Sequence, residues 1–344
     1  MLMKFLRFLL FPFAIIYDGV TTIRNFFFDI GIFKRTSFNT PLIVVGNLSV
    51  GGTGKTPQIE YLIRLLKDHF KVSVLSRGYK RKTKGFVLLN GAHKALDVGD
   101  EPLQYFKKFN NIDVAVDANR VKGVSKLIEL KAPEVILLDD AYQHRKIKGS
   151  FYLLLTKYND LFADDFLLPT GNLRESRSGA KRANIVIVTK CPENLDNQQQ
   201  EAIKEKLEKF NKEVFFTTIS YGNILSTENK ISIQELKQYD VLLITGIATP
   251  KPLLDFLSVK GISFKHLKYG DHHNFSSLEI EHIKQEFKGV KSAKKIILTT
   301  EKDFTRLEEK IENLYFIKIE TRFLENQKED FNQRIISHIK QNRC

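Results

Sequence analysis

A glycine-rich stretch near the start of the chain contains the residue types that bind a nucleotide phosphate. The apolar run 41–45 precedes it and predicts a buried strand, and apolar residues recur at helical spacing through 59–66 after it. Glycines let backbone N–H groups face phosphate oxygens, and the start of a helix adds a positive dipole. We therefore predict a phosphate-binding loop formed by Ser49, Val50, Gly51, Gly52, Thr53, Gly54, Lys55 and Thr56.

Two residues of this loop carry groups that act on phosphate. Lys55 is expected to reach the β- and γ-phosphates of a nucleotide, and the Thr56 hydroxyl is expected to ligate Mg²⁺. The general motif has glycine six residues before the lysine, where this chain has Ser49. A glycine turn with a purely structural role is the alternative, but the flanking strand and helix favour nucleotide binding.

Paired carboxylates end another predicted strand. The apolar run Val135–Leu138 leads directly into Asp139 and Asp140. In a phosphate-loop enzyme, an acid at this position lies on the metal side of the site, opposite the hydroxyl of the loop. Gln143 and His144 follow, and either a substrate contact or a structural pair is consistent with their position.

Polar residues elsewhere in the chain are candidates for the same site. Gly99-Asp100-Glu101-Pro102 places two acids at a predicted helix start, where an ordinary N-cap is equally consistent. Arg77 ends a second predicted strand, and Arg174 and Glu175 follow a turn. His272 and His273 are adjacent and point in different directions, so a zinc site is not expected without further ligands.

An α/β scaffold is needed to bring these residues together. Most strand candidates are continuous apolar runs, which predict a mostly parallel sheet with helices on both faces, of the P-loop NTPase type. Such sheets bind ligands at the carboxyl ends of their strands. The alternation of strands and helices changes after the charged helix Glu201–Phe210, which predicts a smaller second α/β domain. The expected division is an N-terminal segment 1–38, a P-loop domain 39–220 and a C-terminal domain 221–344. The strand candidates are Leu42–Val45, Val72–Leu75, Val114–Val116, Val135–Leu138, Phe151–Leu155, Ile185–Thr189, Val214–Ser220, Val241–Thr245 and Ile296–Thr299.

The N-terminal segment has an amphipathic pattern. Lys4, Arg7 and Asp18 fall on one helical face, and the opposite face carries Leu2, Phe5, Leu6, Leu9, Phe13 and Ile16. The uncharged run Phe8 to Tyr17 is too short to cross a bilayer, which takes about 20 residues, and no small-residue cleavage site follows it. We expect a helix lying in the interface of an anionic, cytosolic leaflet, although packing against the protein's own core is the alternative.

The composition is that of a folded, basic protein. With 344 residues, 42% of them hydrophobic, the chain has enough apolar surface for a packed core. The formal charge of +14 favours an anionic partner, namely nucleic acid, anionic lipid or a phosphorylated substrate. Nucleic acid is not expected, because no basic-aromatic binding motif is present. The two cysteines, Cys191 and Cys344, predict neither a disulfide framework nor a metal site.

The order of the motifs resembles one family. The chain contains, in order, the stretch 46–57, Ser76-Arg77-Gly78-Tyr79, Gly99-Asp100-Glu101-Pro102, Asp139-Asp140 with Gln143-His144, Leu168-Pro169 with Gly171 and Leu173-Arg174-Glu175, Asp271-His272-His273 with Phe275, and Thr300-Glu301-Lys302-Asp303. Together they resemble the tetraacyldisaccharide 4'-kinases, the membrane-associated lipid A 4'-kinases of Gram-negative bacteria. The resemblance extends to about residue 303, and the family tolerates a small hydroxyl residue at the position of Ser49.

The resemblance implies a reaction and a set of roles. The reaction transfers the γ-phosphate of ATP to the 4'-hydroxyl of an acylated glucosamine disaccharide 1-phosphate, which gives lipid IVA in lipid A biosynthesis. Asp100 matches the catalytic base and His272 the histidine coupled to it. Lys55 would stabilise the transferring phosphate, with Mg²⁺ held by Thr56, Asp139 and Asp140. Other polar residues of the site would be Arg77, Glu101, Arg174 and Glu175.

The resemblance also implies a location, and one alternative function stays open. A peripheral position on the cytoplasmic face of the inner membrane is expected, without an obligate protein partner. The alternative is a soluble P-loop NTPase that acts as a switch or assembly factor. A guanine-specific GTPase switch needs the motif Asn/Thr-Lys-x-Asp. Glu301-Lys302-Asp303 lacks the spacer residue, and Thr189-Lys190-Cys191-Pro192 lacks the acid. A guanine-specific GTPase is therefore disfavoured.

Overall fold

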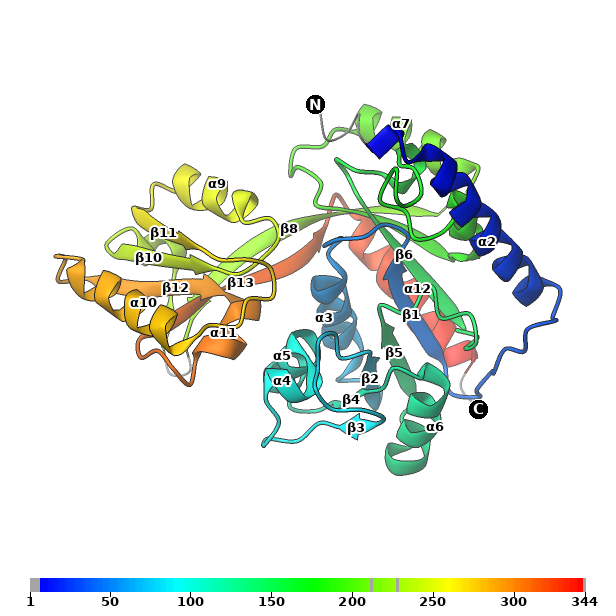
Figure 1. Cartoon of the computed structure of the whole chain (residues 1–344), viewed down its shortest axis with the longest axis horizontal. Coiled ribbons are helices and arrows are strands. Elements are labelled where there is room, and N and C mark those ends of the chain that lie inside the picture. The colour runs from blue at the N-terminus through cyan, green and yellow to red at the C-terminus, as the bar shows by residue number, and fades with distance from the viewer. Residues whose placement is uncertain (1–6, 211–212, 227–228, 343–344) are drawn as a thin grey trace.

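The computed structural model describes residues 7–210, 213–226 and 229–342. Leu2, Lys4, Phe5 and Leu6 of the predicted N-terminal helix, together with Cys344, lie outside the described residues. The chain forms two lobes that share one continuous twisted sheet (Figure 1).

The first lobe is built on the strand that leads into the phosphate loop. Its strands run in the order β3-β4-β2-β5-β1-β6-β7-β8, and all neighbours pair in parallel except the short edge strand β3. Five of the strands are buried along their whole length or nearly so, as continuous apolar runs predict. The bounds are β1 Leu42–Asn47, β2 Val72–Ser76, β3 Val87–Leu88, β4 Asp113–Val116, β5 Val135–Asp139, β6 Phe151–Lys157, β7 Ile185–Thr189 and β8 Val214–Leu225.

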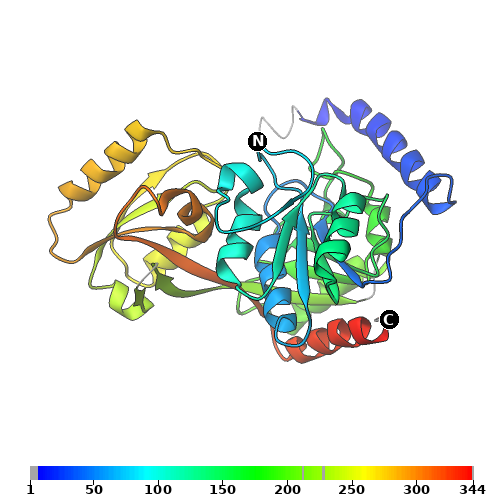
Figure 2. The ribbon, with the colours of Figure 1, turned by 90° about the horizontal axis from the view of Figure 1, so that it is seen from below.

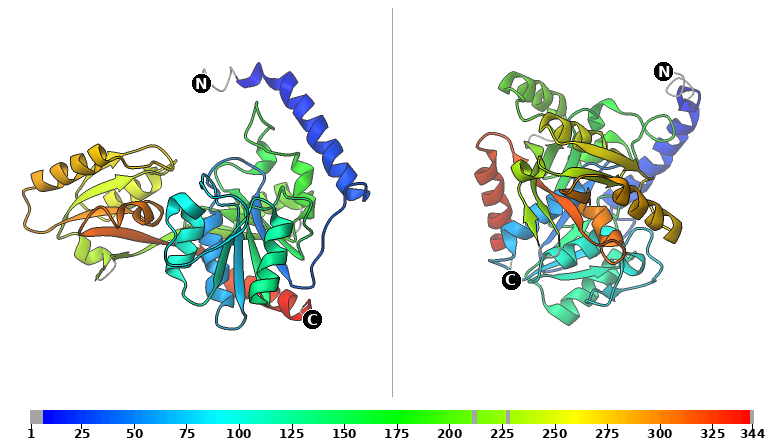
Figure 3. Two further views of the ribbon diagram at one scale, coloured as in Figure 1. Left: turned by 60° about the horizontal axis from the view of Figure 1, so that its bottom comes forward. Right: turned by 90° about the vertical axis from the view of Figure 1, so that its left-hand side faces the viewer.

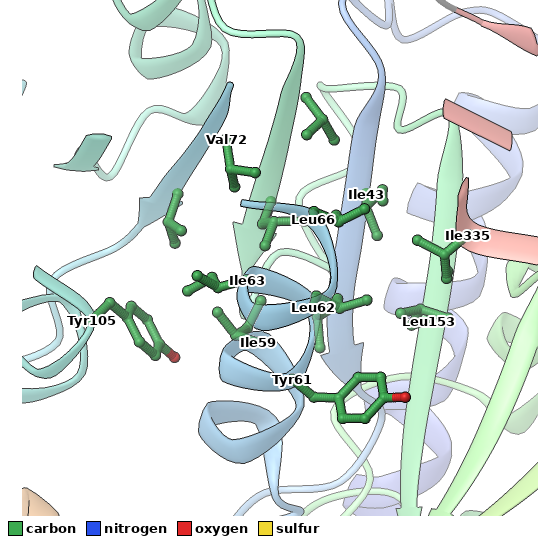
Figure 4. Packing of buried hydrophobic residues seen from close by; sticks show 14 of the residues in the cluster. Ile43, Ile59, Tyr61, Leu62, Ile63, Leu66, Val72, Tyr105, Leu153 and Ile335 are labelled. Atoms are coloured by element: carbon green, nitrogen blue, oxygen red, sulfur yellow. The ribbon is translucent and has the colours of Figure 1, made fainter. Parts of the chain in front are cut away.

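Helices cover both faces of this part of the sheet. One face packs against α3 (Lys55–Leu66), α4 (Ala95–Val98), α5 (Asp100–Lys108) and α12 (Gln327–Gln341). The other face packs against α6 (Arg120–Lys131) and α7 (Asn197–Glu208), with the short 3-10 helices η1 (Phe162–Asp164) and η2 (Arg177–Arg182). Figure 4 shows Ile59, Leu62 and Ile63 of α3 against the strands. The predicted α/β fold, with a mostly parallel sheet covered on both sides, is confirmed.

The second lobe repeats this layering on a smaller scale. Strands β11, β10, β12 and β13 pair in parallel, and helices pack on both sides of them around two further apolar clusters. The bounds are β9 Lys230–Ile231, α8 Ile233–Leu236, β10 Asp240–Thr245, α9 Lys251–Val259, β11 Phe264–Lys268, α10 Ser277–Gly289, β12 Lys295–Thr300, α11 Glu301–Leu307 and β13 Leu314–Phe323.

Two long strands, β8 and β13, carry the sheet from one lobe into the other (Figure 1). The start of β8 pairs with β7, and the rest pairs antiparallel with β13. The predicted division at residue 220 therefore falls inside a strand. The structure also differs from the predicted range 221–344, because α12 packs its Ile335 into the first core (Figure 4). The periodicity of a helix shows an apolar stripe, but not which core that stripe covers.

The N-terminal helix α2 (Phe11–Asp29) lies along the outside of the first lobe (Figure 2). Its buried positions are Ala14, Thr21, Asn25 and Phe28, so two of the four are polar. Leu9, Phe13 and Ile16 of the predicted apolar face are each more than half exposed, so they point away from the protein, and Val20 and Ile23 extend this exposed apolar surface along the helix. Among the described residues, no helix combines the length and apolar character needed to span a membrane.

A buried ionic cluster joins the two lobes. The Lys108 ammonium on α5 lies 2.7 Å from Glu60 of α3 and 2.6 Å from Glu301 at the start of α11. Burial, followed by the negative charge of Glu60, raises the pKa of Glu301 to about 7. One lysine thus faces two buried carboxylates, so the cluster holds a proton more tightly when the protein is folded.

We predict that Glu301→Gln stabilises the protein at alkaline but not at acidic pH. Because the folded-state pKa of Glu301 is raised from 4.5 to about 7, its ionisation destabilises the folded state as pH rises through that range. The introduced amide would resemble the protonated acid, so the gain should be on the order of 3 kcal/mol at about pH 8 and near zero at about pH 4, below the unfolded-state pKa. The denaturant midpoint at the two pH values measures this gain. The exposed Glu312→Gln change is the matched control, and an equal shift at both pH values would contradict the prediction.

Candidate active site

The phosphate loop follows β1 and leads into α3, in the predicted strand–loop–helix arrangement. Gly51 and Gly54 adopt φ values of 97° and 86°, which strain any residue with a side chain, so glycine is required at both turns. Asn47, the last residue of β1, donates from Nδ2 to the Thr53 hydroxyl at 3.0 Å. The loop is therefore fixed from within, with the first N–H groups of α3 left for a ligand.

The carboxylates after β5 lie beside this loop. Asp139 is buried, and its Oδ2 accepts a hydrogen bond from the Ser76 hydroxyl at 3.1 Å. The Lys55 ammonium lies 3.4 Å from Oδ1 of Asp140, and an Arg174 guanidinium nitrogen lies 3.5 Å from its Oδ2. Three of the predicted site residues thus lie together, namely Lys55 of α3, Asp140 directly after β5 and Arg174 of the 166–175 loop.

The electrostatics of the paired acids suit a divalent cation. Burial, followed by the charges of Asp140 and Glu101, raises the pKa of Asp139 to about 6. Burial also acts to raise the pKa of Asp140, but Lys55 and Arg174 outweigh it and hold that pKa below its usual value. Oδ1 of Asp140 is buried, and the Lys55 ammonium at 3.4 Å is the only polar partner found for it among the described residues. Carboxylate and hydroxyl oxygens are the ligands that Mg²⁺ prefers, so these acids and the Thr56 hydroxyl fit such an ion.

A second charged centre forms around Asp100 at the start of α5. Asp100 is only 2% exposed, and its Oδ2 lies 2.9 Å from Nδ1 of His272. Arg306 of α11 donates from Nε to Oδ1 and from a terminal nitrogen to Oδ2, each at 2.6 Å. Burial acts to raise the pKa of Asp100, but the hydrogen bonds from His272 and Arg306 and the charge of Arg306 hold it below its usual value.

The histidine is held in place by its own neighbours. Nε2 of His272 lies 2.9 Å from the Lys302 ammonium, and the Tyr79 ring packs edge-on against the imidazole. Lys302 also lies 3.8 Å from Glu101. Asp100 and Glu101 of the first lobe therefore both meet cations of the second lobe, so the centre forms only where the two lobes touch.

The two charged centres influence one another electrostatically. The charge of Glu101 contributes to the raised pKa of Asp139. Burial raises the pKa of Tyr105 on α5, and the charges of Asp139 and Glu101 raise it further. Side chains of α5 and β5 also pack in the same apolar core, so the start of α5 and the end of β5 lie in one part of the first lobe.

Four further predicted residues take other places. Glu175 is fully buried and binds Arg182 through both carboxylate oxygens, so it is part of the scaffold. Gln143 donates to Glu175 at 3.1 Å. Burial and the charges of Arg120 and Arg77 lower the pKa of His144 to about 4, so this imidazole is neutral. Arg77 itself is exposed beside it.

Sequence reasoning missed several residues of the site. Arg306 follows the noted Thr300–Asp303 motif by one helical turn, but its pairing with Asp100 spans 206 positions. Lys190 donates to the carbonyl of Gly52 at 2.7 Å and reaches the phosphate loop from the end of β7. A cation directly after a predicted strand at the same sheet edge was an available signal for Lys190, whereas the sequence held no signal for the partner of Arg306.

Comparisons with known proteins agree with the resemblance seen in the motifs. The family model described as tetraacyldisaccharide-1-P 4'-kinase matches residues 6–340. Proteins called tetraacyldisaccharide 4'-kinase from Flavobacterium johnsoniae and Flavobacterium psychrophilum are 52% and 53% identical, over 99% and 98% of both chains. A crystal structure of apo-form LpxK from Aquifex aeolicus in complex with ATP is 30% identical, with a TM-score of 0.78, over 97% of this chain and 99% of that one. The expectation from the motifs is confirmed, and the chain belongs to the tetraacyldisaccharide 4'-kinase family.

Proposed function

We propose that this protein transfers the γ-phosphate of ATP to the 4'-hydroxyl of an acylated glucosamine disaccharide 1-phosphate, with Asp100 as the catalytic base. The observation that carries this proposal is the buried Asp100 carboxylate, which His272 and Arg306 of the second lobe hold at the start of α5, where the two lobes meet. A switch protein has no need of a fixed base at this position, so the geometry favours the kinase.

Asp100 would orient the hydroxyl and take its proton late. Its Oδ2 accepts hydrogen bonds from His272 and Arg306, whereas Oδ1 accepts only from Arg306 among the described residues. The remaining lone pair of Oδ1 is therefore the site for the hydroxyl proton. A carboxylate with a lowered pKa is a weak base, which suffices because phosphoryl transfer passes through a loose transition state governed by positioning and charge.

ATP would be held by the phosphate loop. Backbone N–H groups at the start of α3 would bind phosphate oxygens, and Lys55 would turn from Asp140 towards the γ-phosphate. Thr56, Asp139 and Asp140 would hold Mg²⁺, which when bound neutralises charge on the phosphates. Arg174 and Lys190 lie beside the same loop and would add positive charge around the transferring group.

A lipid acceptor explains the outward apolar face of α2. A helix of a protein in water ordinarily turns its apolar residues inwards, and α2 does the reverse. We propose that this face lies in the anionic cytoplasmic leaflet of the inner membrane, where the acyl chains of the acceptor remain. The net charge of +14 supports attraction to that surface.

ATP consumption should depend on the acylated acceptor. With ATP, Mg²⁺ and the tetraacylated disaccharide 1-phosphate in detergent micelles, the purified full chain should form the bis-phosphorylated lipid and ADP in equal amounts. The measurement is a phosphate-transfer assay followed by mass spectrometry of the lipid. Equal ADP production without the disaccharide would instead support the switch alternative.

Asp100→Asn should lower kcat by a factor of about 10²–10⁴, with a much smaller change in KM, because the base acts in the transition state. Steady-state kinetics for both substrates measure the changes in kcat and KM separately. Binding of ATP, measured by titration, should be retained and shows that the variant is folded. Asp68→Asn, an exposed change of the same charge, is the control. A large rise in KM with unchanged kcat would refute the role of the base.

Serine substitution at Ile16, Val20 and Ile23 should reduce binding to vesicles at least about tenfold, because each exposed aliphatic side chain contributes about 1.5–3 kcal/mol when buried in lipid. Flotation with vesicles of phosphatidylethanolamine and phosphatidylglycerol measures the bound fraction. Val259→Ser combined with Leu278→Ser changes two exposed apolar residues of the second lobe and should leave binding unchanged. If the triple variant floats with the vesicles as much as wild type does, the proposed membrane role of α2 is wrong.

A further inference from the structure

We propose that α2 also positions the phosphate loop, through Tyr17 and Asn25, so that the position of the helix sets the rate of phosphate transfer. This inference rests on the proposed function. It assigns to the inward side of α2 a role separate from the binding of lipid by its outward side. The link between helix and loop is the segment 166–175, which we call the strap.

The strap is attached to the N-terminal segment at several points. The Tyr17 hydroxyl donates to the backbone carbonyl of Arg174 at 2.8 Å, and Asn25 donates from Nδ2 to Glu175 at 3.0 Å. Arg7 donates to the carbonyls of Pro169, at 3.1 Å, and Gly171. Phe8 and Phe11 also pack edge-on against Phe166. Figure 3 shows the N-terminal segment running alongside the first lobe, which carries the strap, while Phe13, Ile16 and Val20 of the same segment are each more than half exposed.

The strap is in turn bonded to the phosphate loop. The backbone N–H of Val50 donates to the carbonyl of Asn172 at 2.8 Å, and the N–H of Arg174 donates to the carbonyl of Leu48 at 2.8 Å. Ser49 and Leu173 form an antiparallel bridge between these two bonds. The first residues of the phosphate loop therefore pair with the strap as a short two-stranded ribbon, so a shift of the strap moves the loop.

A second path leads from α2 to the same loop through side chains. Oε2 of the buried Glu175 accepts from Asn25, and its Oε1 accepts from Gln143 at 3.1 Å. Gln143 also donates to the carbonyl of Asn47 at 2.8 Å, at the end of β1. Asn47 in turn donates to Thr53 within the loop. The hydrogen bonds thus form a continuous line from α2 to the turn that precedes Lys55.

The strap also carries a side chain of the site. Arg174 accepts the Tyr17 hydrogen bond on its carbonyl, and its guanidinium lies 3.5 Å from Asp140. Loss of the Tyr17 contact should loosen the backbone that directs this guanidinium, without removing any group that touches ATP or lipid. Tyr17 and Asn25 are therefore positioning residues, whose loss should lower kcat more than it raises KM.

The experiment compares Tyr17→Phe and Asn25→Ala with wild type in the full chain. Tyr17→Phe keeps the ring and removes only the hydroxyl, so folding is preserved. We expect kcat in the micelle assay to fall about fivefold for each, the factor that corresponds to one hydrogen bond, with little change in KM. Flotation with phosphatidylethanolamine–phosphatidylglycerol vesicles should stay at the wild-type level. Thr22→Ala removes an exposed hydroxyl from the same helix and is the control.

Amide hydrogen exchange gives a readout that does not depend on activity. The amides of Val50 and Arg174 form the ribbon between loop and strap, so both should exchange faster in Tyr17→Phe and at the wild-type rate in Thr22→Ala. An unchanged kcat, or a fall in kcat that follows a loss of vesicle binding, overturns the proposal. If wild type transfers no phosphate to the disaccharide, the proposed function fails, and exchange at these two amides alone decides whether α2 positions the loop.

Discussion

The structure depends on the pairing of one buried carboxylate across two lobes. Asp100 belongs to the first lobe, while His272 and Arg306 belong to the second, and all three meet where Asp100 has almost no contact with solvent. A buried charge is costly unless it is paired and hydrogen-bonded, so separating the lobes would leave Asp100 exposed to water or unpaired. The interaction that holds the lobes together is thus the one that would orient the base of the reaction.

The remaining contacts between the lobes support this pairing. The ribbon of β8 and β13 joins the two lobes through backbone hydrogen bonds, and the cluster of Glu60, Lys108 and Glu301 adds a second ionic contact beside it. Lys108 faces both acids of that cluster, with Arg64 3.6 Å from Glu60, and the pKa of Glu301 is nevertheless raised, so the cluster is less favourable at high pH than the pairing of Asp100. Ligand binding between the lobes would therefore act on a joint that is held by the β8–β13 ribbon and by ion pairs.

The N-terminal helix brings the membrane and the chemistry together. Its apolar residues face outwards, which is unfavourable in water and favourable in the interface of a lipid bilayer. Its inward residues are bonded to the strap, and the strap is bonded to the phosphate loop. Under the proposed function the acceptor stays in the bilayer, so the phosphate donor would need a fixed depth relative to the lipid surface, and these contacts would provide such a reference.

The sequence by itself determined the local parts of this protein. The strand, glycine loop and helix at 42–66, the apolar strands and the existence of an apolar stripe on α2 all follow from periodicity and residue type, which act between near neighbours. Only the tertiary structure decided that α12 covers the first core, that β13 pairs with β8 and that Arg306 meets Asp100. The strand β11 was also missed, because charged residues interrupt its apolar pattern. Such pairings depend on how the two cores pack against each other. The local residue pattern of a segment does not show which distant segment pairs with its buried charge or covers its apolar stripe.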